Sequence, residues 1–217
     1  MAAQISFERP FKHVFQDPNW AKKGLMGALI SLSCIVLIGI PVLAGYSKRL
    51  FLAVSKDENA PIPEIDFGKD LGEGLGLVGL GLVYGIAFSI VSGILGFIPL
   101  LGKLVIFALW LAMMVVMPVA MMRYMATGQF AAAFDFKAII DFIKGNLTNL
   151  LLMLAIFIVV YVAVPFGGIA CGVGALFTGF LGGLVCTITM ADVWRLAQQG
   201  EASPVAAPPS NDAPPAP

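Results

Sequence analysis

Long apolar stretches dominate this chain and predict membrane-spanning helices. Five stretches contain no Asp, Glu, Lys, Arg or His: residues 24–46, 75–97, 104–122, 147–164 and 168–190. A crossing needs roughly 17–25 apolar residues at about 1.5 Å per residue, and lipid requires that each segment satisfy its own backbone hydrogen bonds. The pattern predicts an all-α, polytopic membrane helical bundle of five hydrophobic helices within residues 24–195. The joints at residues 98–103 and 165–167 are short, so the second and third helices, and the fourth and fifth, should form hairpins.

Two polar segments have the spacing of amphipathic helices. In the N-terminal segment, residues 1–23, apolar positions alternate at helical spacing with polar ones: Phe7, Phe11, Val14 and Phe15 against Glu8, Lys12, His13 and Gln16. The segment between the third and fourth apolar stretches shows the same spacing: Phe136, Ile139, Ile140 and Ile143 against Lys137, Asp141 and Lys144. Both are expected to lie in the plane of the membrane interface.

The first apolar stretch has two interpretations. Lys and Arg concentrate on the cytoplasmic side of membrane proteins. If residues 24–46 cross fully, five basic residues lie on one side of the membrane and eight on the other. If this segment enters and returns, twelve lie on one side and only Lys103 lies on the other. Gly39-Ile40-Pro41 offers a place to turn, but two short limbs oppose the return. Both interpretations place the long loops and the C-terminal tail in the cytoplasm, whereas a cleaved signal peptide is disfavoured by the long polar segment that precedes the stretch.

Composition supports a membrane protein and excludes a nucleic-acid-binding one. The 217 residues are 59% hydrophobic and 12% charged, with a mean hydropathy of +0.92, whereas soluble proteins are about 45–50% apolar and about 25% charged. Thirteen basic residues balance thirteen acidic ones, so no bulk charge attracts nucleic acid. Residues 196–217 are rich in Pro and Ala and are predicted to form a disordered tail.

Several chemistries lack the residues that they need. His13 is the only histidine and lies outside every apolar stretch, which excludes haem held by a transmembrane His and Ser-His catalysis inside the membrane. No carboxylate lies within a stretch, which argues against an ion-coupled pump. The first loop gathers five carboxylates, but its prolines and lysines are typical of a solvated connector: Glu58, Glu64, Asp66, Asp70 and Glu73. We therefore expect no enzyme, no cofactor and no metal site, and we interpret the single cysteines as small apolar residues: Cys34, Cys171 and Cys186.

Small residues recur at four-residue spacing and predict close helix packing. Gly74, Gly76 and Gly79 match a dinucleotide-binding pattern, but they open an apolar helix with no βαβ context, so we reject that interpretation. The small-residue stripes are Gly81, Gly85, Ser89 and Gly93; Ala175, Gly179 and Gly183; and Gly168 with Gly172. Such stripes let helix backbones approach. They favour a tightly packed pair of the second and fifth helices, or else an oligomer contact.

Methionines and aromatic residues complete the set of candidate positions. Met113, Met117, Met121 and Met125 follow four-residue spacing. Thioethers can bind Cu(I), but Met more commonly fills irregular gaps, and copper binding is the weaker alternative. Aromatic residues near the ends of the stretches are expected to anchor the chain at the water interface: Trp20, Tyr46, Tyr124 and Trp194.

The order of several residues resembles a known family. The segments are Phe15-x-Asp17-Pro18-x-Trp20-x-x-Lys23-x-x-x-Gly27, Pro41-x-x-x-Gly45-Tyr46, and Pro61-x-Pro63-x-x-Asp66 followed by Gly74-Leu75. They resemble a family of prokaryotic multi-pass membrane proteins catalogued as a domain of unknown function, over roughly residues 7–195. The resemblance implies the cytoplasmic membrane of a prokaryote and carries over no catalytic residue.

These observations favour an accessory or scaffold protein of the membrane. Its expected partners are the lipid bilayer and a protein partner or further copies of itself, without nucleic acid. The alternative is a small uncoupled channel, carrier or export component with a hydroxyl-lined path between the two hairpins.

Overall fold

The computed structural model describes residues 4–32, 38–98, 100–167 and 173–202. In the chain order of these residues, the α-helices are α1 (Arg9–Gln16), α2 (Trp20–Leu32), α3 (Gly39–Lys56), α4 (Phe67–Gly96), α5 (Leu101–Thr127), α6 (Phe136–Gly145), α7 (Leu147–Gly167) and α8 (Val173–Ala202), and the short 3-10 helix η2 (Phe130–Phe134) precedes α6. The all-α prediction is confirmed for these residues, which contain no strand.

Four helices in the described part of the chain are long and apolar enough to cross a membrane: α4, α5, α7 and α8. Within the stretch 24–46, the structure describes α2 as far as Leu32 and α3 from Gly39, while residues 33–37 lie outside the described residues. A fifth continuous span over residues 24–46 is therefore not confirmed.

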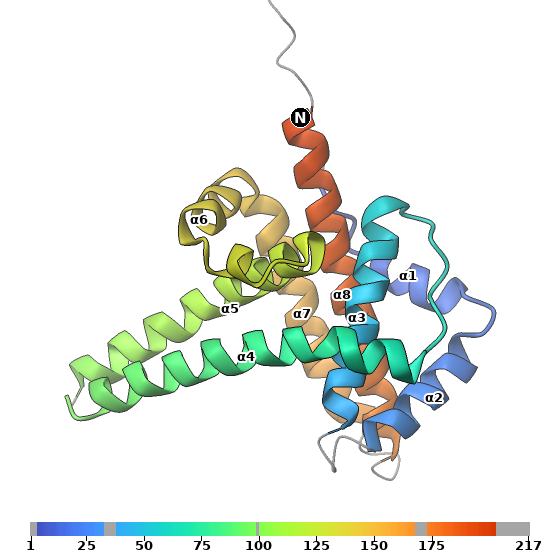
Figure 1. Cartoon of the computed structure of the whole chain (residues 1–217), viewed down its shortest axis with the longest axis horizontal. Helices are drawn as coiled ribbons and strands as arrows, with labels where there is room; N and C mark the ends of the chain where they lie inside the picture. The colour runs from blue at the N-terminus through green and yellow to red at the C-terminus, as the bar shows by residue number, and fades with distance from the viewer. Residues whose placement is uncertain (1–3, 33–37, 99, 168–172, 203–217) are drawn as a thin grey trace, which may run out of the picture.

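Helix α8 lies at the centre of the fold. It packs against α1, α2, α3 and α7, and Figure 1 shows it upright beside α3 and α7. Glycines allow two of these approaches, because a Cβ at Gly27 of α2 would lie 2.4 Å from the ring of Phe180, and a Cβ at Gly182 would lie 2.7 Å from Val160 of α7. The helix continues to Ala202, so residues 196–202 are helical and not part of a disordered tail, while residues 203–217 lie outside the described residues.

The backbones of α3 and α4 cross in direct contact. A Cβ at Gly45 would lie 1.9 Å from the Asp70 carbonyl oxygen, and one at Gly74 would lie 1.7 Å from the Pro41 carbonyl oxygen. Only glycine allows two helices this close. The pairing differs from the expected tight pair of α4 with α8, because α3 is the partner with which α4 packs most extensively.

Beyond this crossing, α4 and α5 run out from the rest of the molecule side by side (Figure 1). Among the described residues between Tyr84 and Val119, Gly102 alone is buried. We call residues 85–118 the arm. Among its described residues, Lys103 is the only charged one, and most of the others are apolar.

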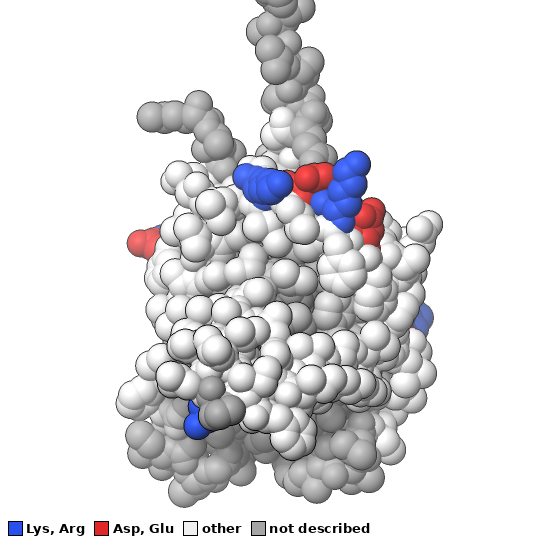
Figure 2. Space-filling view, turned by 90° about the vertical axis from the view of Figure 1, so that its left-hand side faces the viewer, with Lys and Arg blue, Asp and Glu red and all other residues white. Residues whose placement is uncertain are grey.

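The two amphipathic segments form helices where they were expected. Helix α1 buries Pro10 and Val14, and α6 buries Ile139, while Lys137, Asp141 and Lys144 are exposed. An aspartate begins α6 as its N-cap, since Asp135 Oδ1 accepts a hydrogen bond from the Ala138 amide at 3.1 Å. Figure 2 shows the molecule with the end of the arm toward the viewer. Most charged side chains gather along the upper edge, and a broad, mostly uncharged surface lies below them.

Candidate functional site

Residues 57–66, which join α3 to α4, form the most extensively bonded polar segment of the described chain. We call them the connector. Pro61 and Pro63 have no amide hydrogen and cannot continue a helix, so the carbonyl groups of this segment need donors from elsewhere. Side chains from α1, α2 and α3 supply these donors.

Four connector carbonyls accept hydrogen bonds from four different side chains. Arg9 donates to the Glu58 carbonyl, Lys23 to Ile62 at 2.6 Å, Tyr46 to Pro63 at 3.2 Å and Arg49 to Glu64 at 2.7 Å. The side chains of Ala60 and Ile62 are buried beneath the segment. The connector is therefore held at both ends and at its middle, although half of its ten residues are exposed: Asp57, Glu58, Asn59, Pro61 and Glu64.

A buried ion pair lies below the connector at the crossing of α3 and α4. Arg49 contacts the Asp70 carboxylate with two nitrogens, Nε to Oδ1 at 2.6 Å and Nη2 to Oδ2 at 2.9 Å. Asp70 also accepts the Asp66 amide at 2.9 Å, and its side chain is fully buried. The bidentate geometry fixes the guanidinium, so that its remaining donor capacity reaches Glu64.

A second group of charges joins α1, the connector and α8. Asp192 of α8 is buried and forms ion pairs with Arg9 and, at 3.6 Å, with Arg195. Arg195 also pairs with Glu58, and this contact lowers the pKa of the Glu58 carboxyl below its usual value. Two cations and two anions balance, so this group joins three segments without leaving a net charge for a ligand.

The carboxylates singled out in the sequence do not converge on one point. Asp70 pairs with Arg49, Glu58 with Arg195, Asp66 caps α4 and lies 3.4 Å from Lys69, and Glu73 lies 3.6 Å from Lys48. Four of the five carboxylates therefore have their own cationic partner. This arrangement suits a structural role better than paired acid–base chemistry.

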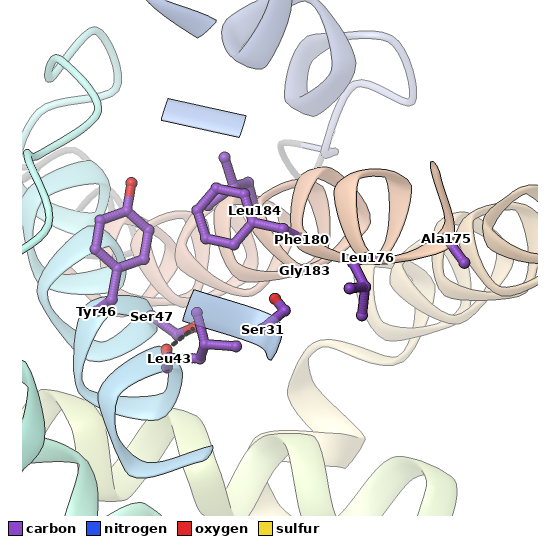
Figure 3. A pocket seen from close by; sticks show the side chains of 10 residues that line it. Ser31, Leu43, Tyr46, Ser47, Ala175, Leu176, Phe180, Gly183 and Leu184 are labelled. Carbon is purple, nitrogen blue, oxygen red and sulfur yellow. Dashed lines mark hydrogen bonds between the residues drawn. The ribbon is translucent and has the colours of Figure 1, made fainter. Parts of the chain in front are cut away.

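A pocket of about 200 Å³ lies between α2, α3 and α8 (Figure 3). Its lining is Ser31, Leu43, Tyr46, Ser47, Ala175, Leu176, Gly179, Phe180, Gly183 and Leu184. The small-residue stripe of α8 predicted from the sequence thus lies along this pocket. Tyr46 and Phe180 lie side by side at one end of it, with ring centroids 5.7 Å apart.

The other predicted packing positions have different surroundings. On α4, a Cβ at Gly81 would lie 3.8 Å from Met117 Cε, whereas a Cβ at Gly85 or Gly93 would meet nothing within 4 Å. Ser89 is exposed. Gly168 and Gly172 lie outside the described residues, as do Cys34 and Cys171.

The methionine row runs from the arm into the body of the protein. Met113, Met117 and Met121 are half-buried, and Met125 is buried. Met117 lies opposite Gly81, which fits the gap-filling interpretation. Copper binding by this row stays an untested alternative.

The expected aromatic anchors are mostly inside the protein. Tyr46 and Tyr124 are buried, and Trp194 stacks on Phe142 with ring centroids 5.6 Å apart. Trp20 packs on Phe177 at 6.2 Å. The anchoring role is therefore wrong for Tyr46 and Tyr124, whose hydroxyl and ring make contacts within the fold, because a position at the end of an apolar stretch does not distinguish a lipid-facing side from a protein-facing one.

Sequence reasoning missed Asp192 and the pair of Arg49 with Asp70. Signals for both were present. Asp192 lies three residues before Arg195, a spacing that brings opposite charges together on a helix. Arg49 follows Gly45 by four residues, and Asp70 precedes Gly74 by four, so each charge lies one turn from a glycine of the crossing.

Comparison with known proteins gives a family without an assigned activity. A family model described as a protein of unknown function, DUF4013, matches residues 28–173. The chain belongs to this family. The match covers α3 through α7 with their connector, whereas the Asp17-Pro18-x-Trp20 segment lies before it. No curated protein and no solved structure matches the chain.

Proposed function

We propose that this DUF4013 protein is an accessory or scaffold protein of the membrane, and that the connector is its surface for a protein partner. The observation that carries the proposal is the set of four carbonyl contacts that hold the connector. A segment that is already ordered loses little conformational entropy when it binds, which favours association. The connector also presents exposed side chains outward, including Asn59, Pro61 and Glu64.

Purification from the native membrane in mild detergent, followed by mass measurement, tests this proposal. We expect a stoichiometric heteromeric complex. Glu64→Lys should release the partner, since it reverses a charge on the exposed connector while the backbone carbonyl still accepts from Arg49. The matched control is Asp141→Lys on the exposed face of α6. A wild-type protein that purifies only as a monomer or homo-oligomer, or equal retention of the partner by both variants, would contradict the proposal.

We further propose that α2 and α3 form a re-entrant hairpin, with the N-terminal segment and the end of α8 on the cytoplasmic side of a prokaryotic cytoplasmic membrane. Contacts between chain ends support this topology. The Ile5 amide donates to Asn149 Oδ1 at the start of α7, and Arg9 pairs with Asp192 near the end of α8. The length objection weakens, because 13 residues in α2 and 18 in α3 give limbs of about 20 and 27 Å.

Single cysteines introduced into a variant without the three native ones test the topology. Glu8→Cys, Lys103→Cys and Gln199→Cys place thiols at exposed positions. With a membrane-impermeant maleimide on spheroplasts, residue 103 should react, and residues 8 and 199 should react only after lysis. Five full spans would instead make residue 8 react together with residue 103.

A further inference from the structure

The pocket between α2, α3 and α8 has the chemistry of an apolar binding site. Leu43, Leu176, Phe180 and Leu184 supply most of its side-chain surface, and no charged residue lines it. The pocket also opens at the protein surface, because Gly183 is exposed and Leu43 and Leu176 are only half-buried. A ligand can therefore enter from the side.

The three hydroxyl groups of the pocket do not make it a polar site. Ser31 donates to the Gly27 carbonyl at 2.8 Å, and Ser47 donates to the Leu43 carbonyl at 2.9 Å, one turn back on their own helices. Tyr46 donates to Pro63 in the connector. Each hydroxyl has one proton and has already used it, so the described residues that line the pocket offer no free hydroxyl donor to a polar solute.

Glycines keep the pocket open along α8. A Cβ at Gly183 would meet nothing within 4 Å, and one at Gly179 would meet only Val164 at 3.9 Å. A Cβ at either position would therefore fit without meeting the backbone of α2 or α3. The stripe of small residues on α8 thus leaves room beside the helix at the pocket and does not bring a second helix into contact there.

We propose that this pocket binds the acyl chain of a membrane lipid. Its volume of about 200 Å³ exceeds the roughly 150 Å³ of an apolar protein cavity that accepts benzene. That is enough for part of a hydrocarbon chain and too little for a lipid headgroup with its hydration. The pocket also has no cation for a phosphate, so the bound part is the chain. A lipid chain bound in this pocket would lie between α8 and the helices α2 and α3, which both pack against α8.

Photo-crosslinking in vesicles tests the proposal. The full chain is reconstituted in phosphatidylethanolamine and phosphatidylglycerol vesicles with a trace of phosphatidylcholine that carries a diazirine in its acyl chain. Adducts are mapped by mass spectrometry. We expect adducts at Leu43 and Leu176, reduced at least about five-fold in Gly183→Leu, which fills the pocket. The matched control, Gly85→Leu on the arm, should leave them unchanged, and adducts on the arm itself give the general labelling by lipid.

Other occupants give distinct results. Equal pocket adducts in the wild type and in Gly183→Leu would overturn the proposal, as would labelling of Leu43 and Leu176 by a water-soluble diazirine, which indicates an aqueous path. In a parallel sample in which a photoreactive leucine analogue replaces leucine, crosslinks from these two positions to another copy of the chain would identify a protein occupant and also overturn the proposal. If Gly183→Leu loses its native elution profile in detergent, Ala175→Leu at the other end of the pocket lining makes the same test.

Discussion

Helices α4 and α8 are both 30 residues long, both contain several glycines and both lack charge at their centres, yet they have different surroundings. In the most apolar stretch of α8, 56% of residues are buried, against 17% in α4. Helix α8 packs against α1, α2, α3 and α7 and also contacts α5, whereas α4 beyond Tyr84 continues into the arm beside α5. Lipid and protein interior are both apolar, so hydrophobicity alone does not distinguish the two helices. The difference lies in what each glycine faces.

Substituting one glycine in each region gives the largest expected contrast. Gly74→Ala would place a Cβ 1.7 Å from the Pro41 carbonyl oxygen and 2.6 Å from the Gly45 amide nitrogen, and neither backbone group can move without separating α3 from α4. We expect a loss of at least about 3 kcal/mol in the free energy of unfolding. Denaturant titration in detergent micelles, followed by circular dichroism, measures it.

The control is Gly85→Ala on the arm, where a Cβ meets nothing within 4 Å. Its stability should be unchanged or higher by up to about 1 kcal/mol, because Ala favours helix over Gly. The small-residue stripe alone would instead predict that Gly85→Ala lowers stability. A large loss at Gly85 would show that the arm packs against another protein surface in the micelle.

The ion pair at the crossing should have the next largest effect. Asp70→Asn leaves Arg49 without its charged partner in a site where Asp70 is fully buried. Breaking such a pair costs about 3–5 kcal/mol when both charges are buried, and the partial exposure of Arg49 reduces our expectation to about 2–3 kcal/mol. The same micelle titration applies. Lys69→Gln, which breaks the exposed pair with Asp66, should change stability much less than Asp70→Asn does; similar losses for both variants would contradict the contrast.

The elements of this fold were readable from the sequence, but their arrangement was not. Apolar stretches over residues 75–97, 104–122 and 147–164 correctly gave α4, α5 and α7, and helical spacing gave α1 and α6. The first stretch did not give the bounds of its helices, because these extend into polar residues on both sides. Helix α2 starts earlier, at Trp20, and α3 continues through Lys48 and Arg49 to Lys56.

The candidate sites depend on contacts between distant segments, and for that reason they escaped prediction. Prolines in the connector indicated a loop, but only the fold shows that Lys23 and Tyr46 reach its carbonyls. The sequence likewise did not show which glycines of α4 would contact the backbone of another helix. Gly74 meets α3, Gly76 would place a Cβ 1.8 Å from the Tyr124 hydroxyl, and Gly85 meets nothing. Their spacing is helical in every case, so spacing alone cannot rank them.

A hydrogen bond at the base of the arm gives a smaller expected effect. Tyr84, the last buried residue of α4, donates to the Ala133 carbonyl of η2 at 2.6 Å. Tyr84→Phe leaves this buried carbonyl without its donor and should cost about 1–2 kcal/mol. Tyr161→Phe on α7 is the matched control, because its side chain is 83% exposed and should change stability by less than about 0.5 kcal/mol. Equal effects in thermal unfolding would mean that the arm is not fixed at Tyr84.

The smallest expected effect is a pH dependence of stability, which distinguishes α1 from the arm. Helix α1 carries His13, whereas Lys103 is the only charged residue among the described residues of the arm. Burial lowers the pKa of His13 below its ordinary 6.5, and the nearby Arg9 lowers it further. The folded state therefore favours neutral imidazole. Stability is complete above about pH 6.5 and declines as the pH falls below it, because the unfolded chain binds the proton first.

The melting temperature in detergent should fall by about 1–2 °C between about pH 7.5 and pH 5.5, a small shift because His13 is only half-buried. His13→Gln, which keeps a donor for the connector, should remove this slope. The carboxyl of Glu58 does not interfere, since the contact with Arg195 lowers its pKa below 4.5, outside the window. If the melting temperature of His13→Gln still falls with pH, another group causes the pH dependence, and the contact between α1 and the connector does not.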